Sequence, residues 1–106
     1  MIRWPLVVLS LLSVPAFADE TRDLWMDKCK NCHGEDGRAD TKTGRKEKVA
    51  DISAPQWQKK RTDADIRKVI EEGSSENRKM KAYKDRLTPE QIDLLVGFIR
   101  DLKPNH

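Results

Sequence analysis

The residues with the clearest chemistry form one short run, Cys29-Lys30-Asn31-Cys32-His33. Two cysteines separated by two residues and followed directly by a histidine are the pattern of covalent haem attachment in c-type haem proteins. Each thiol can add to one of two vinyl groups on the same porphyrin edge, and a helical turn gives the sulfurs a matching separation. The imidazole then lies beneath the ring, where it can bind iron axially. The sequence therefore predicts one haem c, attached through Cys29 and Cys32 with His33 as a metal ligand.

Three other interpretations of the cysteine pair remain open. A thioredoxin-type redox disulfide suits an oxidising compartment, but that fold needs alternating strands and helices around the cysteines, and this sequence does not show them. A structural zinc site needs four protein ligands, whereas the run supplies three and the only other histidine is His106. A structural disulfide across two residues of a helix closes too small a loop to add much stability. Haem attachment is favoured over all three.

The first eighteen residues have the three regions of a secretion signal. Arg3 gives a cationic start, residues 6–14 are an apolar run broken only by serines, and the segment ends in Ala16-Phe17-Ala18. The apolar run is too short for a membrane span, which needs about 20 apolar residues. We expect residues 1–18 to be a signal peptide cleaved after Ala18, and residues 19–106 to be a domain exported to the periplasm. The alternative is an uncleaved anchor, in which the Ala-Phe-Ala end has no role.

Composition limits what the mature chain can be. The sequence has 106 residues, which fits one small domain. After Ala18 only 26 of 88 residues are hydrophobic, and 20 Lys and Arg stand against 18 Asp and Glu. This mixed charge excludes a basic nucleic-acid binder and an acidic tail. So small a supply of apolar side chains needs another component to complete the core, and a buried porphyrin would provide one.

The helical periodicity predicts three helices. The first, over residues 20–32, carries the attachment cysteines on one face. The second follows Thr62 and ends at Gly73, and the third follows Thr88 and ends before Pro104. Thr88 is followed by a proline at the first helical position and by a glutamine three residues later, which is the pattern of a capped helix start.

The segments between these helices predict long loops. Residues 34–56 and 73–87 contain glycines and many charges but neither helical nor alternating periodicity. Loops of this length in a small domain usually wrap around something. No segment alternates long enough for a strand, so the predicted fold class is all-α.

These residues together resemble the small monohaem class I cytochromes c. The resemblance covers most of residues 20–103, and it implies a small cytochrome c fold of three to four helices with long loops wrapped around one covalently bound haem. The position of the attachment motif near the mature N-terminus speaks against the cytochromes c′. The resemblance rests on the run Cys29 to Gly34, a glycine-containing loop, Asp51-Ile52-Ser53 ahead of Trp57, the capped helix from Thr62, the Met80 segment, and Leu87-Thr88-Pro89-Glu90-Gln91-Ile92.

The resemblance also implies a distant methionine as the second axial ligand. Met26 lies three residues before Cys29 on the same helix, so it would have difficulty reaching the opposite face of the haem. Met80 is the candidate, in a Met80-Lys81-Ala82-Tyr83 run that resembles the family's Met-Pro-Ala-Tyr loop with lysine in place of proline. The alternatives are that Met80 fills the core, that His106 is the ligand, or that the iron has an open or water-bound position.

Other side chains have less specific predicted roles. Trp57 either directs its indole N–H to a haem propionate or fills the core. Phe98 and either Leu24 or Trp25 are expected to meet where the first and last helices cross, as the family resemblance implies. His33 is expected to donate the proton of its other ring nitrogen to a backbone carbonyl.

If side chains fill both axial positions of the iron, the remaining function is one-electron transfer, and we expect a carrier rather than an enzyme. Its partners would be redox proteins that dock transiently on a monomer, with no nucleic acid and no membrane span after cleavage. The rival functions are a haem-based gas sensor or weak peroxidase with an open sixth position, and a thiol–disulfide oxidoreductase. Candidate charges for steering partners, or for ordinary solvation, are Lys28, Lys30, Lys79, Lys81 and Lys84.

Overall fold

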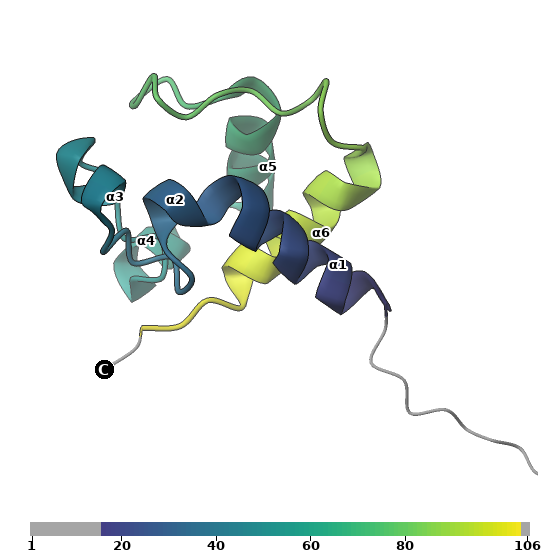
Figure 1. Cartoon of the computed structure of the whole chain (residues 1–106), viewed down its shortest axis with the longest axis horizontal. Helices are drawn as coiled ribbons and strands as arrows, with labels where there is room; N and C mark the ends of the chain where they lie inside the picture. The colour runs from purple at the N-terminus through teal and green to yellow at the C-terminus, as the bar shows by residue number, and fades with distance from the viewer. Residues whose placement is uncertain (1–15, 105–106) are drawn as a thin grey trace, which may run out of the picture.

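The computed structural model describes residues 16–104, and within that range it contains only helices and loops. Most of the predicted signal peptide, residues 1–15, lies outside the described residues. His106 also lies outside them. In chain order the elements are α1 (Ala16–Leu24), the π-helical turn η1 (Trp25–Cys29), α2 (Lys30–His33), α3 (Lys42–Lys46), α4 (Pro55–Lys60), α5 (Asp63–Glu72) and α6 (Pro89–Arg100). The first three form one continuous helix (Figure 1). The all-α prediction is confirmed.

The two predicted capped helices are present with reciprocal capping bonds. The Thr62 hydroxyl accepts from the Asp65 N–H at 3.1 Å, and the Asp65 carboxylate accepts from the Thr62 N–H at 2.9 Å. Thr88 and Gln91 form the same pair at 3.1 and 2.9 Å at the start of α6. These bonds satisfy amide groups that have no partner within the helix. Gly73, with a φ of 86°, ends α5 as predicted.

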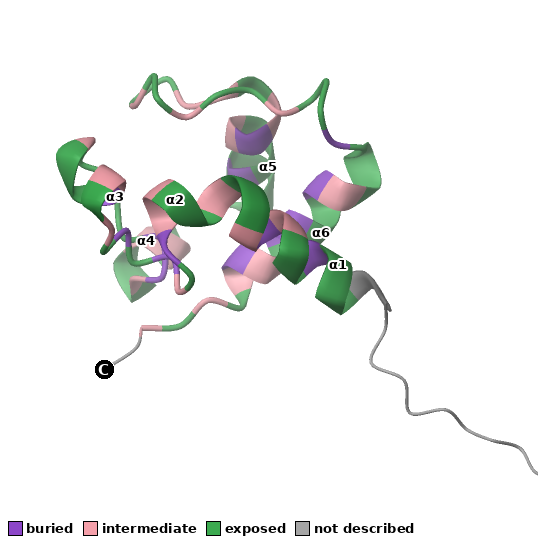
Figure 2. Ribbon diagram, viewed as in Figure 1, coloured by how far each residue is buried: buried purple, intermediate pink, exposed green. Residues whose placement is uncertain are grey.

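The core lies where α6 crosses the first helix and contacts α5 (Figure 1). At the crossing, the rings of Trp25 and Phe98 have centroids 5.0 Å apart, which confirms the predicted contact. Buried positions concentrate along these facing surfaces, while the outer surfaces are exposed (Figure 2). The buried apolar cluster consists of Trp25, Ile52, Ile66, Ile70, Leu87, Ile92, Leu95, Val96 and Ile99.

The segment predicted as one long loop, residues 34–56, contains the short helix α3 and the start of the short helix α4, so that prediction was wrong in part. The sequence of α3, Lys-Thr-Gly-Arg-Lys, has no apolar face and contains a glycine, which disfavours a helix. Tertiary contacts hold it in place: the Thr41 hydroxyl donates to the carbonyls of Asn31 and Cys32, both at 3.0 Å, and accepts from the Gly44 N–H at 2.8 Å. α3 therefore packs directly against α2.

A Gly44→Ala substitution is expected to destabilise this contact. A Cβ atom at position 44 would lie 2.4 Å from the Ala39 carbonyl oxygen and 2.5 Å from that of Cys32, so the backbone must shift. We expect the free energy of unfolding, measured by urea denaturation, to fall by about 1–3 kcal/mol. Gly97 is the control, because a Cβ there meets no atom within 4 Å on the exposed side of α6. Gly97→Ala should raise stability by about 0.5–1 kcal/mol, and equal effects at both positions would contradict the close contact.

A polar cluster ties α4 to α6. The Gln58 side-chain amide donates to the carbonyls of Ile52 and Ile99 at 2.7 and 3.0 Å. The Arg100 guanidinium donates to the Gln58 carbonyl at 2.7 Å and to the Asp63 carboxylate at 2.6 Å. These bonds fix the end of α4 and the start of α5 on the last helix.

Candidate haem site

The attachment motif follows a π-helical turn. The Lys30 N–H donates to the carbonyl of Trp25, five residues earlier, so the turn holds one residue more than an α-helical turn. Such turns are frequent at functional sites because they change the direction in which the following side chains point. Here the turn ends at Cys29. Cys29 and Cys32 are both free thiols and both half-buried.

One small cavity brings the attachment motif and the Met80 segment together. Its volume is about 30 Å³, smaller than a porphyrin, so α2 and the Met80 segment must separate to admit one. Met26 and Cys32 do not line it. The donor set fits a haem, because a thiol, an imidazole and a thioether meet there among apolar walls. The lining residues are Trp25, Lys28, Cys29, His33, Ile70, Met80, Tyr83, Leu87, Leu95 and Ile99.

His33 is half-buried, and one of its ring nitrogens has no hydrogen-bond partner within the described residues. Burial lowers the pKa of His33, which favours the neutral imidazole that binds metals. Its Nδ1 atom is buried and makes no hydrogen bond among residues 16–104, so the expected bond to a backbone carbonyl is absent. The carbonyls of His33 and Gly34 have other donors, namely the Ala39 N–H at 2.8 Å and the Trp25 indole at 3.0 Å.

Trp25 has a role at the site that was not predicted from the sequence. It is 1 % exposed, and its indole N–H donates to the carbonyl of Gly34, the residue after His33. Its ring centroid lies 5.7 Å from that of His33. The residue type at position 25 could have indicated this hydrogen bond. A buried tryptophan usually needs an acceptor for its indole N–H, whereas a phenylalanine would pack at the helix crossing without one.

Trp25→Phe keeps an aromatic ring at the crossing but removes this hydrogen bond. Because the Gly34 carbonyl then loses its shorter hydrogen bond and keeps only the one from the Gly37 N–H at 3.4 Å, we expect the free energy of unfolding in urea to fall by about 1–2 kcal/mol. Trp57→Phe is the matched control. Trp57 is half-buried against the core with the Arg61 guanidinium 5.7 Å from its ring centroid, and its indole has no hydrogen bond within the described part of the chain. An equal or larger loss at position 57 would contradict the role of the Trp25 hydrogen bond.

The Met80 segment is held by hydrogen bonds rather than by a proline. The Met80 N–H donates to the Asn77 carbonyl at 3.0 Å, and the Met80 carbonyl accepts from the Ser74 N–H at 3.2 Å. The Asn77 side-chain amide reaches the Glu47 carbonyl at 2.9 Å, which links the segment to the end of α3. Lys81 is exposed. The role of Asn77 could not be predicted from the sequence, because no local pattern shows a partner thirty residues away.

The Cys29 thiol is poorly suited to thiol–disulfide exchange. Burial raises its pKa to about 11, and Lys28 opposes this only in part. Reactive cysteines have lowered pKa values because the thiolate is the nucleophile. Among residues 16–104 there is also no cluster of three His, Cys, Asp or Glu side chains that could hold a metal ion. These observations support neither the redox disulfide nor the zinc site.

No helix in the described part of the chain is long and apolar enough to cross a membrane.

The sequence left two roles open for Trp57, a hydrogen bond to a haem propionate or packing in the core. Trp57 packs against the core and does not line the cavity.

Comparison with known proteins identifies the family. The family model described as "Cytochrome C oxidase, cbb3-type, subunit III" matches residues 16–99. The solved structure of the KustC0563 c-type cytochrome is 34% identical with a TM-score of 0.71, and the match covers 79% of this chain and 98% of that one. A structure of a point mutant of KustC0563 gives 35% identity, a TM-score of 0.68, and coverage of 78% and 98%. A search of curated proteins gives no match. The chain therefore belongs to the cytochrome c domain family of cbb3-type subunit III, as a monohaem c-type cytochrome with covalently bound haem c.

Proposed function

We propose that this cytochrome carries single electrons between larger exported redox proteins. In this proposal Cys29 and Cys32 would hold the haem through thioether bonds, and His33 and Met80 would bind its iron. The observation that carries it is the shared cavity, which brings Cys29 and His33 of the first helix against Met80 of a distant segment. The bound haem would supply a reversible one-electron change of its iron.

The side chains around the cavity support this role. Ile70, Leu95 and Ile99 form apolar walls that keep water from the site. A neutral His33 and a methionine thioether favour the ferrous state and raise the reduction potential. With both axial positions filled by protein, no position is left for oxygen or substrate, and this disfavours a sensor or a peroxidase.

The proposed place of action is the periplasm, after cleavage following Ala18. The partners would be redox proteins that bind through small, transient interfaces to a monomer. The five lysines near the attachment and ligand segments are all exposed, and Lys28 lies 3.6 Å from the carboxylate of its neighbour Asp27. Exposed charges of this kind change the rate of encounter more than the affinity.

Visible spectra and a mass measurement of the exported, purified protein test the proposal. We expect the mass of residues 19–106 plus one haem, a six-coordinate c-type spectrum in both oxidation states, and no rapid binding of carbon monoxide to the reduced protein. Rapid carbon monoxide binding would favour the gas sensor or weak peroxidase. A mass without haem, with Cys29 and Cys32 reversibly oxidised, would favour the thiol–disulfide oxidoreductase.

A further inference from the structure

We propose that α3 forms the docking surface for an acidic region of a redox partner and places that partner beside Cys32. We call this surface the α3 face and define it by the exposed side chains of Lys42, Arg45, Lys46 and Lys48. The inference rests on the proposed function, because it takes Cys32 to be bonded to the haem. The α3 face is a different surface from the Met80 segment, where Lys79, Lys81 and Lys84 lie.

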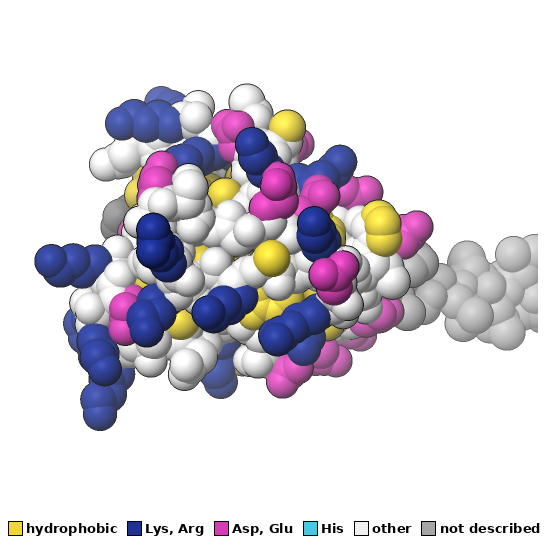
Figure 3. Space-filling view, turned by 90° about the horizontal axis from the view of Figure 1, so that it is seen from above, with side chains coloured by type: hydrophobic (Ala, Val, Ile, Leu, Met, Phe, Trp, Pro, Cys, Tyr) yellow, Lys and Arg dark blue, Asp and Glu magenta, His cyan; other side chains and the backbone are white. Residues whose placement is uncertain are grey.

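The end of the molecule that carries both α3 and α4 is unusually cationic for a chain of nearly balanced charge. Residues 42–61 contain seven basic residues (Lys and Arg) and two acidic residues (Asp and Glu). Residues 16–27 contain one basic residue and four acidic residues. Figure 3 shows the result, with Lys and Arg concentrated at the end of the molecule opposite the α1 end, where Asp and Glu are frequent. Such an asymmetry orients an approaching charged protein before contact.

Three of the four charges on the α3 face are not neutralised by the protein. Arg45 forms an ion pair with Asp40 at 2.5 Å. Lys42, Lys46 and Lys48 make no side-chain hydrogen bond or ion pair with the described part of the chain. Their charges are therefore available to a carboxylate of another protein.

The contacts under α3 hold these charges next to the attachment motif. The Thr41 hydroxyl bonds to the Cys32 carbonyl at 3.0 Å, and Gly44 lies so close that any Cβ would clash with the same oxygen. On the other side, the Asn77 amide holds the Glu47 carbonyl at 2.9 Å. A partner seated on the α3 face would thus lie beside the backbone of Cys32, the residue proposed to bond the haem.

Two observations favour a protein partner over an anionic membrane. The only exposed large hydrophobic side chain among residues 18–104 is Leu94, on α6, and α3 itself has no apolar side chain to insert into lipid. A surface groove of about 390 Å³ beside α3 is lined by charges of both signs, including Lys42, Asp36 and Asp40. A membrane presents only negative charge to those carboxylates, whereas a protein can place acidic side chains at the lysines of the α3 face and basic ones at the carboxylates of the groove.

The test measures electron transfer from the reduced, haem-containing cytochrome to an oxidised, acidic blue copper protein by stopped flow. One electron passes from ferrous haem to cupric copper, giving ferric haem and cuprous copper, with no bond or proton exchanged. For Lys42→Glu/Lys46→Glu we expect the second-order rate constant at low ionic strength to fall about tenfold. The difference should disappear at high salt, because added ions screen exposed charges.

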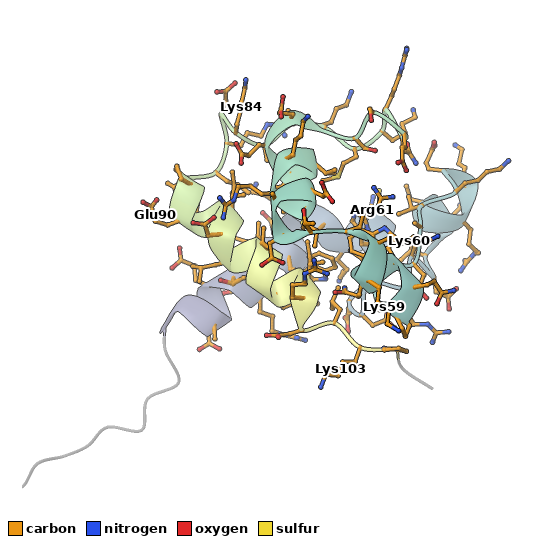
Figure 4. All side chains as sticks on the ribbon, turned by 180° about the vertical axis from the view of Figure 1, so that it is seen from behind. Lys59, Lys60, Arg61, Lys84, Glu90 and Lys103 are labelled. Carbon is orange, nitrogen blue, oxygen red and sulfur yellow. The ribbon has the colours of Figure 1, made fainter. Side chains whose placement is uncertain are left out.

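Lys59→Glu/Lys60→Glu is the matched control. It reverses the same charge at the same basic end of the molecule, but on α4, which lies behind α2 in Figure 1 and in front in Figure 4, where both lysines are labelled. Neither side chain forms an ion pair within the described residues. We expect less than about a twofold change in rate. Equal slowing by both variants would show an effect of overall charge and overturn the proposal, as would an unchanged rate in the α3 variant.

A vesicle experiment separates the two kinds of partner. Vesicles rich in phosphatidylglycerol should not sediment the wild-type cytochrome, and sedimentation that Lys42→Glu/Lys46→Glu abolishes would overturn the proposal in favour of a membrane site. The visible spectrum of each variant distinguishes this failure from failure of the proposed function. An intact low-spin spectrum with unaffected rates contradicts only the proposal that partners dock on the α3 face. A missing haem or rapid carbon monoxide binding in the wild type contradicts the proposed function as an electron carrier.

Discussion

Cys29→Ala/Cys32→Ala is expected to abolish covalent haem binding and to leave the exported polypeptide largely unfolded. Only nine apolar side chains form the buried cluster, and the cavity that the cluster borders is also lined by Cys29, His33 and Met80. Ordering each residue costs roughly 1.5 kcal/mol, which a core this small does not offset without an added apolar group. The mass should equal that of the polypeptide, and the helical signal in circular dichroism should fall several-fold without a cooperative melt.

The single substitution Cys32→Ala is the control, because one thioether at Cys29 can still retain the haem. We expect this variant to keep the haem mass and most of its helicity, with a lower melting temperature than the wild type. Native helicity and a cooperative melt in the double variant would show that the polypeptide folds without haem. That result would contradict the structural role of the haem and leave its attachment chemistry unaffected.

The sequence allowed the helices with local signals to be predicted. The ends of α5 and α6 follow from Thr62, Gly73 and Thr88, because capping residues act on amide and carbonyl groups within one turn. The position of the first helix follows from its apolar spacing and from the attachment motif. The π-helical turn within it changes the register by one residue, and no residue type in Trp25–Cys29 signals such a turn.

Features that depend on distant contacts could not be predicted. α3 exists because Thr41 and Gly44 fit against Cys32, although its own residues have poor helix propensity. The position of Met80 depends on Asn77, which bonds to a carbonyl at the end of α3. Similarly, the lack of an acceptor for His33 Nδ1 reflects which backbone carbonyls are already bonded, and that depends on the folded arrangement of the loop.

Met80→Ala is expected to convert the proposed six-coordinate iron into one with an open axial position. The oxidised protein should lose the sulfur-to-iron charge-transfer band, and the reduced protein should bind carbon monoxide rapidly. Because the thioether stabilises ferrous iron, the midpoint potential should fall by a substantial part of the roughly 0.8 V range over which axial ligands tune haem. Absorption spectroscopy, stopped-flow carbon monoxide binding and a redox titration measure these three changes.

Met26→Ala is the matched control, because Met26 is half-buried against the core on η1 and does not line the cavity. It removes the same thioether from the same domain, so a general loss of stability would affect both variants, whereas loss of a ligand would affect only Met80→Ala. We expect the band, the carbon monoxide rate and the potential of Met26→Ala to match those of the wild type. If the wild-type oxidised protein lacks the charge-transfer band, methionine does not bind the iron, and the hydrogen bonds that Met80 forms with Asn77 and Ser74 then position the segment for another purpose.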